Sequence, residues 1–347
     1  LQIDFNREMD LLLLPKIKRM IVFLQNVYLP KCSEFLGLAS LPNGKKMYRY
    51  LAKNYTTLDS ITIKNIFNIG LKECNRVNKE MMIIIKEYGY TDMSKFNKYL
   101  LSNKKFKYQN EQQVFSAYRK MQKDINKIML SQFKDKISHN YLIKPVPKFN
   151  QKYAPSAYYM SGDISGKRKG VFYLNMNSKD SLNKMDIEAL SLHEGNPGHH
   201  YQITYVMDNK DIPLFIKSSS FTGYDEGWGL YTENLGEYKD SLSYYGKLNM
   251  EILRSVRLVV DTGIHYYNWS IDKCLSFFQK YTSMSKDSIL SEIHRYIACP
   301  GQALAYKIGE LEILALKKKF KGNIKDFHHK IIKDGPMPLA LLKDKFN

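Results

Sequence analysis

Residues 193–200 read His-Glu-Gly-Asn-Pro-Gly-His-His, and the interpretation of the whole chain starts from this stretch. It holds three of the eight histidines, with Glu194 directly after the first of them. A second segment, 224–228, reads Tyr-Asp-Glu-Gly-Trp and follows about one helix later. Two imidazoles, a neighbouring carboxylate and a distant carboxylate are the groups that build a hydrolytic zinc site.

The spacing of the histidines differs from the usual zinc motif His-Glu-x-x-His, in which both histidines share one face of a helix. Each residue of an ideal helix turns by about 100°, so His193 and His199 would point to different faces. Pro197 lacks an N–H group and its ring collides with the preceding turn, while the flanking glycines permit unusual dihedrals. We therefore predict a helix through Glu194, a local bulge, and a resumed helix that brings His199 back to the metal.

A catalytic zinc ion takes three protein ligands and keeps one position for water. The predicted cofactor is one Zn²⁺ per chain, and its predicted ligands are His193, His199 and Glu226. Asp225 and Glu233 remain alternatives to Glu226, and His200 is the alternative to His199. Glu233 could instead hold a ligand histidine from behind, because it lies nearly on the same helical face as Glu226.

Glu194 follows a predicted ligand directly, and we predict that it is the general base. The metal lowers the pKa of its bound water towards ~7, so Glu194 can take the proton and pass it to the leaving amine. The oxyanion that forms on the carbonyl needs a further donor, for which we consider His265, Tyr296 and Tyr306. We assign His265 and Tyr306 to catalysis and Tyr296 to substrate binding, and Arg295 could bind a substrate carboxylate. All four could instead be structural.

Residues 171–177 read as a strand directly before the predicted metal helix. Such a strand can bind an extended peptide by main-chain hydrogen bonds if it lies at the edge of its sheet. Tyr173 and Asn175 are therefore predicted to contact the substrate. An ordinary buried strand is the alternative, and the sequence does not separate the two.

Several further segments resemble one known family. Residues 193–202 resemble the signature His-Glu-Gly-x-Pro-Gly-His-His-x-Gln of the zincin-like domain-of-unknown-function 885 family. Other blocks that resemble this family keep its order along the chain: Gly37–Gly44, Thr56–Thr57, Tyr224–Tyr231, Val260–Tyr266 and Arg295–Gly309. The resemblance implies a zincin-like metallopeptidase architecture with an undefined substrate. Typical members carry a further N-terminal region, so we expect a trimmed or processed form that begins at Leu1.

The composition is that of a globular protein, with 44% hydrophobic and 13% aromatic residues in 347. Apolar periodicity predicts a mainly α-helical fold with a small β-sheet. The family resemblance implies that this is a zincin-like metallopeptidase fold with a substrate cleft. We expect one zincin-like domain over 1–347, in which 1–150 form a helical lobe and 151–347 carry the metal site. The predicted helices cover 1–29, 59–88, 111–137, 184–194, 226–238, 245–265, 270–281, 286–296 and 302–320. Arg257 and Asp261, four residues apart, are predicted to form an ion pair.

The net charge of +19 lies mostly outside the predicted site. Residues 1–150 hold 27 basic and 12 acidic groups, whereas residues 151–300 hold 16 and 17. No nucleic-acid motif accompanies the excess, so nucleic acid is not the expected partner. No stretch approaches the ~18 apolar residues of a membrane span. The four cysteines form no Cys-x-x-Cys pair, so neither a zinc ribbon nor a redox motif is predicted. Widely spaced thiols fit a reducing compartment, and with no signal peptide or membrane segment in this chain a cytoplasmic location is favoured but not determined. The oligomeric state is left open.

The predicted function is that of a zinc-dependent peptidase that hydrolyses short peptides through a metal-activated water. One alternative keeps the metal but hydrolyses a non-peptide amide or ester. Another is a non-catalytic binding protein on the same scaffold. Glu194 disfavours the last alternative, because a pure binder does not need a base beside the metal.

Overall fold

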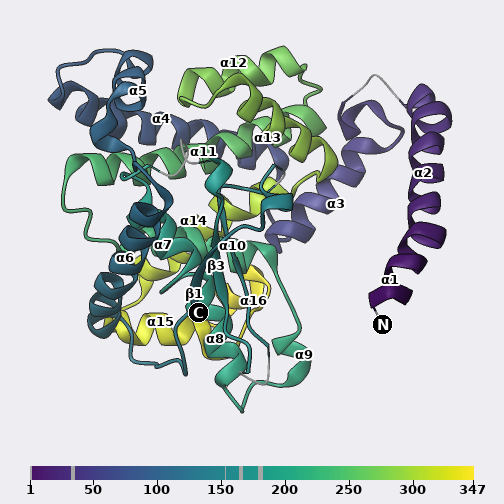
Figure 1. The fold of residues 1–347 in the computed structure, drawn as a ribbon. Helices are drawn as coiled ribbons and strands as arrows, with labels where there is room; N and C mark the ends of the chain where they lie inside the picture. The colour runs from purple at the N-terminus through teal and green to yellow at the C-terminus, as the bar shows by residue number, and fades with distance from the viewer. Residues whose placement is uncertain (1, 33–35, 153, 164–166, 179–182) are drawn as a thin grey trace.

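The computed structural model describes residues 2–32, 36–152, 154–163, 167–178 and 183–347. Helices make up most of this part of the chain, and a three-stranded sheet is packed among them (Figure 1). The mainly helical fold with a small sheet is therefore confirmed. The described helices include none that is long and apolar enough to cross a bilayer.

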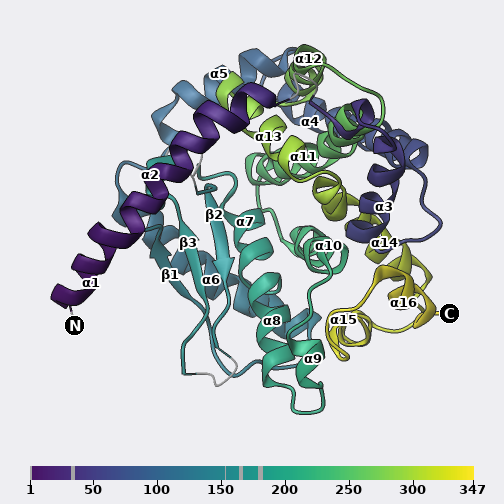
Figure 2. The same ribbon diagram turned by 90° about the vertical axis from the view of Figure 1, so that its right-hand side faces the viewer.

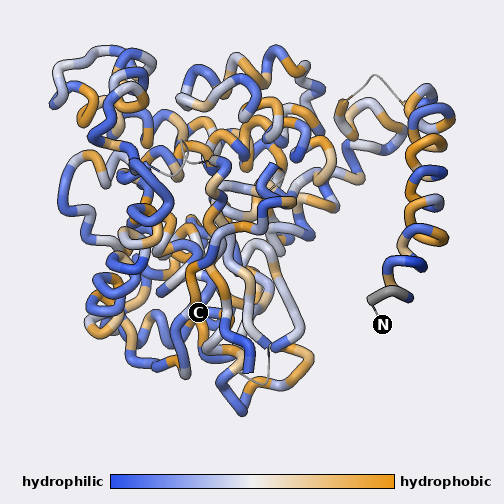
Figure 3. Tube along the Cα trace, viewed as in Figure 1, coloured by the Kyte–Doolittle hydropathy of each residue, from blue (hydrophilic) through white to orange (hydrophobic). Residues whose placement is uncertain are grey.

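The chain begins with a helical rod that stands apart from the body of the molecule (Figures 1 and 2). It contains α1 (Gln2–Glu8) and α2 (Leu14–Phe23), joined by a π-helical turn, and it continues in π- and 3₁₀-helical turns to Lys31. The helix predicted over 1–29 is thus confirmed. Its apolar residues, however, do not pack on the body, since none of residues 4–32 is buried. Figure 3 shows these hydrophobic positions along the rod.

Two 25-residue helices form the centre of the body: α4 (Ile63–Glu87) and α11 (Ser241–His265). They pack along one another, and α3 (Gly44–Thr56) lies at their side (Figure 2). The helix predicted over 59–88 is confirmed as α4, but it begins four residues later than predicted. Thr57 ends α3 in a left-handed conformation with φ 52°, and Thr62 caps α4 by accepting the N–H of Asn65.

A second helix pair crosses near the predicted site: α10 (Thr222–Thr232) and α14 (Ala305–Lys319). The two backbones approach closely at Gly227 and Gly309. A Cβ atom at Gly227 would lie 2.5 Å from the Cα of Gly309, so the crossing requires glycine. α10 begins four residues earlier than the predicted helix 226–238, and the residue that precedes it is Phe221.

The remaining helices surround these pairs. Four of them fall within or near predicted segments: α6 (Glu111–Gln132), α7 (Ile187–Glu194), α12 (Ile271–Tyr281) and α13 (Lys286–Ala298). Five others were not predicted: α5 (Met93–Ser102), α8 (His199–Asp208) beyond its first turn, α9 (Leu214–Lys217), α15 (Ile324–Ile332) and α16 (Leu339–Asp344). These helices are short, and a short apolar pattern does not distinguish a helix from other structure.

The sheet has the order β1-β3-β2, with β1 (Leu142–Pro145), β2 (Ala157–Met160) and β3 (Val171–Leu174). β3 pairs with β1 in parallel and with β2 in an antiparallel manner. The predicted strand is therefore the central one, and both of its edges are used. β2 is the edge strand that lies beside α7 (Figure 2). Of the two alternatives for residues 171–177, the peptide-binding edge strand is therefore wrong, because β3 is paired on both sides. In the described part of the chain, the edge that lies towards the site belongs to β2.

Three clusters of buried apolar side chains stabilise the body. Each cluster combines residues from both sides of residue 150. One joins Tyr48 to Trp228, another joins Val77 to Val256, and the third joins Tyr118 to Phe172. The two predicted lobes therefore share their hydrophobic cores.

Candidate metal centre

The motif His193–His200 forms two helices joined by a tight turn. α7 ends at Glu194, a turn follows with a cis bond between Asn196 and Pro197, and α8 begins at His199. The turn requires glycine at Gly198, because a Cβ atom there would lie 1.9 Å from the carbonyl oxygen of His193. The predicted bulge and resumed helix are confirmed.

The turn brings His193 and His199 face to edge, with ring centroids 4.8 Å apart and planes at 90°. Glu226 of α10 joins them, and one ligand atom from each of the three lies within 4.8 Å of the others. The Glu226 Oε2 atom is 3.6 Å from His193 Nε2 and 3.5 Å from His199 Nε2. Zinc bonds of ~2.0–2.1 Å in tetrahedral geometry separate ligand atoms by roughly 3.3–3.4 Å. The donor types and the two distances from Glu226 are therefore close to those of a zinc site, and the set of three atoms spans up to 4.8 Å without a metal.

Glu233 supports this cluster from behind. Its buried carboxylate accepts a hydrogen bond from His193 Nδ1 at 2.8 Å, so the other ring nitrogen, Nε2, faces Glu226. The guanidinium group of Arg254 lies 3.8 Å from the same carboxylate oxygen. The predicted alternative role of Glu233, to hold a ligand histidine, is the one that its geometry fits, since a carboxylate that orients a histidine sets its tautomer and strengthens it as a ligand.

Two side chains fasten α10 across α7 and the turn. The indole Nε1 of Trp228 donates to the carbonyl oxygen of Pro197 at 2.8 Å. The hydroxyl of Thr232 donates to the carbonyl oxygen of Leu192 at 2.9 Å. Both groups are buried, so these hydrogen bonds are shielded from water. They place Glu226, one residue before Gly227, opposite the histidines.

The rival ligands are occupied elsewhere. His200 is fully buried, where its Nε2 donates to the carbonyl oxygen of His139 at 3.1 Å and its Nδ1 accepts from Tyr159 at 2.9 Å. Burial lowers the pKa of His200 to about 4, which keeps the ring neutral. Asp225 accepts the hydroxyl of Ser220 and the N–H of Phe221 at the start of α10. The geometry thus brings together His199 and Glu226 rather than His200 and Asp225.

The charges of the cluster stabilise one another. Burial alone would raise the pKa of Glu226, but its interactions with His193 and His199 lower that pKa well below its usual value. Burial also opposes a charge on His193, yet Glu226 and Glu233 together raise the pKa of this histidine to about 9. Without a metal the cluster therefore holds a proton that a cation can replace.

Glu194 lies beside the cluster and is fixed by the edge strand. Its Oε2 atom accepts the backbone N–H of Tyr159 in β2 at 2.9 Å. Tyr159 therefore links the predicted base to β2 through its main chain and contacts His200 through its hydroxyl. Tyr159 could not be predicted as a partner of Glu194, because the two residues are far apart in the chain and only the fold brings them together.

Tyr306 lies within electrostatic range of the cluster. Burial raises the pKa of its hydroxyl, and the negative charge of Glu226 raises it further. The hydroxyl oxygen accepts a weak hydrogen bond from the amide of Gln302 at 3.3 Å, which leaves its proton available to another acceptor. The guanidinium of Arg257 stacks over the ring at 4.7 Å and fixes its orientation.

Arg295 and Tyr296 both contact Glu292. Arg295 pairs with this carboxylate at 3.1 Å, and the fully buried hydroxyl of Tyr296 donates to it at 2.5 Å. Tyr296 can therefore influence a substrate only through Glu292, which corrects the direct contact that was predicted. Arg257 also pairs with Glu292, at 3.1 Å, so two arginines share one carboxylate. The predicted pair of Arg257 with Asp261 is not formed, and Asp261 accepts hydrogen bonds from Tyr48 and Gly301 instead.

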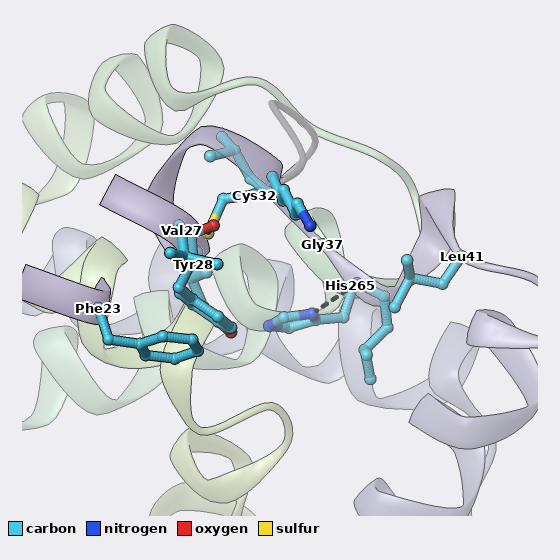
Figure 4. A pocket seen from close by; sticks show the side chains of 11 residues that line it. Phe23, Val27, Tyr28, Cys32, Gly37, Leu41 and His265 are labelled. Atoms are coloured by element: carbon cyan, nitrogen blue, oxygen red, sulfur yellow. Dashed lines mark hydrogen bonds between the residues drawn. The ribbon is translucent and has the colours of Figure 1, made fainter. Parts of the chain in front are cut away.

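His265 is placed between α11 and the start of the chain. Its Nε2 donates to the carbonyl oxygen of Tyr296 at 2.9 Å, and its Nδ1 accepts the N–H of Leu38 at 3.2 Å. Figure 4 shows its ring at the wall of a 680 Å³ cavity, with Phe23 and Tyr28 of the N-terminal rod opposite. Burial lowers the pKa of His265 to about 4. A role as oxyanion donor would require one of these hydrogen bonds to break.

Tyr173 and Asn175 lie in or just after the central strand. Tyr173 stacks on Tyr158 of β2 at 5.2 Å between ring centroids. Asn175 is fully buried, and its amide donates to the carbonyl oxygens of Gln151 and Ala154. Asn175 thus holds the preceding loop and is not accessible to a substrate, which corrects its predicted role.

A family model described as "Bacterial protein of unknown function (DUF885)" matches residues 1–346. No curated protein matches the chain. Among solved structures, a "putative lipoprotein" from Colwellia psychrerythraea is similar, with a TM-score of 0.88 and 29% identity over 92% of this chain. A second one, of unknown function from Shewanella oneidensis, has a TM-score of 0.72 and 15% identity over 95% of this chain, which is a likeness of fold. This chain covers 57% and 63% of the lengths of those two proteins.

Proposed function

The chain belongs to the DUF885 family of bacterial proteins of unknown function, and we propose that it is a zinc-dependent hydrolase of peptide bonds in short peptides. One observation carries the proposal: His193, His199 and Glu226 place three ligand atoms within 4.8 Å of one another. The two distances from Glu226 to the histidine nitrogens, 3.6 and 3.5 Å, support this proposal because they are close to the spacing of zinc ligands, and Glu194 follows His193 directly in the chain. A bound zinc ion would supply a Lewis acid that polarises a carbonyl group and lowers the pKa of water.

The residues of the chain supply the remaining steps of the proposed reaction. Glu194 takes the proton of the attacking water and transfers it to the leaving amine. Strand β2 holds the Glu194 carboxylate in place through the N–H of Tyr159. The hydroxyl of Tyr306 donates to the carbonyl oxygen as negative charge develops on it.

The edge strand favours peptides over other amides and esters. β2 pairs with β3 on one side only, and its other side faces the helix that carries His193 and Glu194. An extended peptide can add to such an edge by main-chain hydrogen bonds, whereas a compact non-peptide amide cannot. The N–H of Tyr159 already donates to Glu194, so a substrate main chain would have to bind other main-chain groups of this edge.

Zinc content and peptide turnover test the proposal together. We expect close to one zinc per chain by elemental analysis, and cleavage of a mixed peptide library read by mass spectrometry. Glu194→Gln should keep the zinc and lose most turnover, because an amide cannot accept the proton of water. A protein that binds no zinc after zinc addition, or a Glu194→Gln variant with near-normal turnover, contradicts the proposal.

A pair of histidine variants tests the ligand assignment. His199→Ala should abolish zinc binding, because it removes one of the three converging atoms. His200→Ala should retain most of the zinc, because both nitrogens of His200 are bonded to other protein groups. Circular dichroism must first show that both variants fold, and a greater zinc loss in the His200 variant would reverse the assignment.

A further inference from the structure

A cavity of 340 Å³ adjoins the metal cluster, and we propose that it binds a carboxylate group of the substrate through Lys217. This inference rests on the peptidase function proposed above and names the chemistry that one part of that site recognises. His199 belongs to the metal cluster and also lines the cavity. A peptide whose scissile bond lies at the metal would therefore place a neighbouring part of its chain in this cavity.

One face of α8 forms the apolar wall of the cavity. Four lining residues follow His199 at helical spacing, so they share one face of the helix with it: Gln202, Ile203, Val206 and Met207. The wall runs along the helix axis for about 12 Å, at 1.5 Å per residue from His199 to Met207. It thus offers a track for the apolar part of a substrate between the metal and the far end of α8.

Lys217 stands at the far end of this track. Lys217 lines the cavity, and its ammonium group donates one hydrogen bond, at 2.9 Å, to the carbonyl oxygen of Met207 near the end of α8. A lysine that only capped this helix would make the same contact. An ammonium group has three donors, however, and Lys217 forms no ion pair within the described part of the chain. Two donors therefore remain for a ligand.

The other charged group of the cavity favours an anionic rather than a cationic ligand. Asp225 lines the cavity, but its carboxylate already accepts hydrogen bonds from Ser220, Phe221 and Gln202 at 2.7, 3.1 and 3.3 Å. These three donors occupy both of its oxygens. Among the described residues that line the cavity, Lys217 is the only lysine or arginine, and its ammonium group forms no ion pair with Asp225.

The length of the track defines where the carboxylate must lie in the substrate. An extended peptide rises about 3.3–3.4 Å per residue, so about 12 Å corresponds to roughly three to four residues from the metal. A carboxylate can reach Lys217 either as the C-terminus of a short peptide or as a glutamate side chain. The two sources share the same chemistry, and the experiment below separates them.

Binding to a protein that cannot turn over its ligand tests the proposal. Zinc-loaded Glu194→Gln protein would be titrated into fluorescein-labelled eight-residue peptides of alanine and phenylalanine, and anisotropy would report binding. One glutamate is moved along the peptide, with glutamine as its neutral counterpart, and each peptide is made with a free and an amidated C-terminus. The same titrations are repeated with Lys217→Met, Lys217→Arg and, as a control, Lys210→Met, which alters an exposed lysine outside the cavity.

We expect the best-placed carboxylate to increase affinity about tenfold over its neutral counterpart, because a charge-assisted hydrogen bond is formed. Lys217→Met should abolish this preference, whereas Lys217→Arg and Lys210→Met should retain it. A preference that follows the free C-terminus identifies the chain end, and one that follows glutamate identifies a side chain. Equal affinity for charged and neutral peptides, a preference that persists in Lys217→Met, or no binding of any peptide overturns the inference. Cleavage of neutral peptides by the unaltered protein would then still uphold the peptidase function.

Discussion

Glu233 offers a direct test of the candidate metal centre, because it touches a ligand without being one. Its fully buried carboxylate accepts the His193 Nδ1–H at 2.8 Å and so orients Nε2 towards Glu226. Loss of such a partner typically lowers metal affinity by about 10- to 100-fold, or roughly 1.4–2.8 kcal/mol. Glu233→Gln keeps an oxygen that can accept this hydrogen bond but removes the charge, so we expect a loss near tenfold. Glu233→Ala also frees the ring, so we expect a loss nearer a hundredfold.

Competition with a zinc chelator of known affinity measures the effect, and Glu237→Gln is the matched control. Glu237 is close to Glu233 in the chain, but its side chain is exposed and pairs with Lys239 rather than with the cluster. Zinc affinity in the control should equal that of the unaltered protein. Unchanged affinity in both Glu233 variants, with folding shown to be intact, would refute the reasoning that Glu233 supports a zinc ligand.

Three further predictions follow from particular contacts. Tyr306→Phe should lower kcat by about a hundredfold or more while zinc content stays constant. The reason is that the hydrogen bond donated by Tyr306 strengthens only as charge develops on the carbonyl oxygen. An unchanged kcat in steady-state assays would show that Tyr306 does not take part in the reaction. Burial raises the pKa of Asp261 to about 7, so the folded protein binds its proton more tightly than the unfolded chain, and this group lowers stability progressively as pH rises from about 4 to about 7. Asp261→Asn should therefore gain stability relative to the unaltered protein over that range, by at most on the order of 4 kcal/mol, and denaturant titrations showing a pH-independent difference would contradict this. Gly309→Ala should destabilise the protein by about 1–3 kcal/mol and weaken zinc binding, because its Cβ atom would lie 2.0 Å from the carbonyl oxygen of Gly223 on the helix that carries Glu226. Thermal unfolding measures the first effect and chelator competition the second. No change in either would show that the helix crossing can relax.

The sequence alone predicted the local structure correctly where that structure depends on neighbouring residues. Pro197 and the two glycines around it forced a break between His193 and His199, and the turn is found where they predicted it. The apolar periodicity of the long helices was also sufficient, as α4 and α11 show. These features depend on steric and hydrophobic preferences that act over a few residues.

Contacts between distant residues could not be read in this way. Nothing in the sequence indicated that β3 would be the central strand, or that Tyr159 of β2 would hold Glu194. The sequence left two possible roles for Glu233, as a metal ligand or as a support for a ligand histidine. Only the fold showed its carboxylate hydrogen-bonded to His193. Such pairings depend on how helices and strands pack in three dimensions, and residue spacing alone does not contain that information.

Residues 193–200 and 224–228 were sufficient to predict which chemistry the candidate site would have, because two histidines and two glutamates in this arrangement are typical of a hydrolytic zinc site. Only packing in three dimensions shows which donors converge. α10 crosses α14 at glycine contacts and is fastened to α7 and the following turn by Thr232 and Trp228, which brings Glu226 to the histidines and turns Asp225 away. Packing also determines that the polar groups of His265, Tyr296 and Asn175 form hydrogen bonds within the protein. The physical reason is that a buried polar group must find a hydrogen-bond partner, and packing determines which partner is within reach.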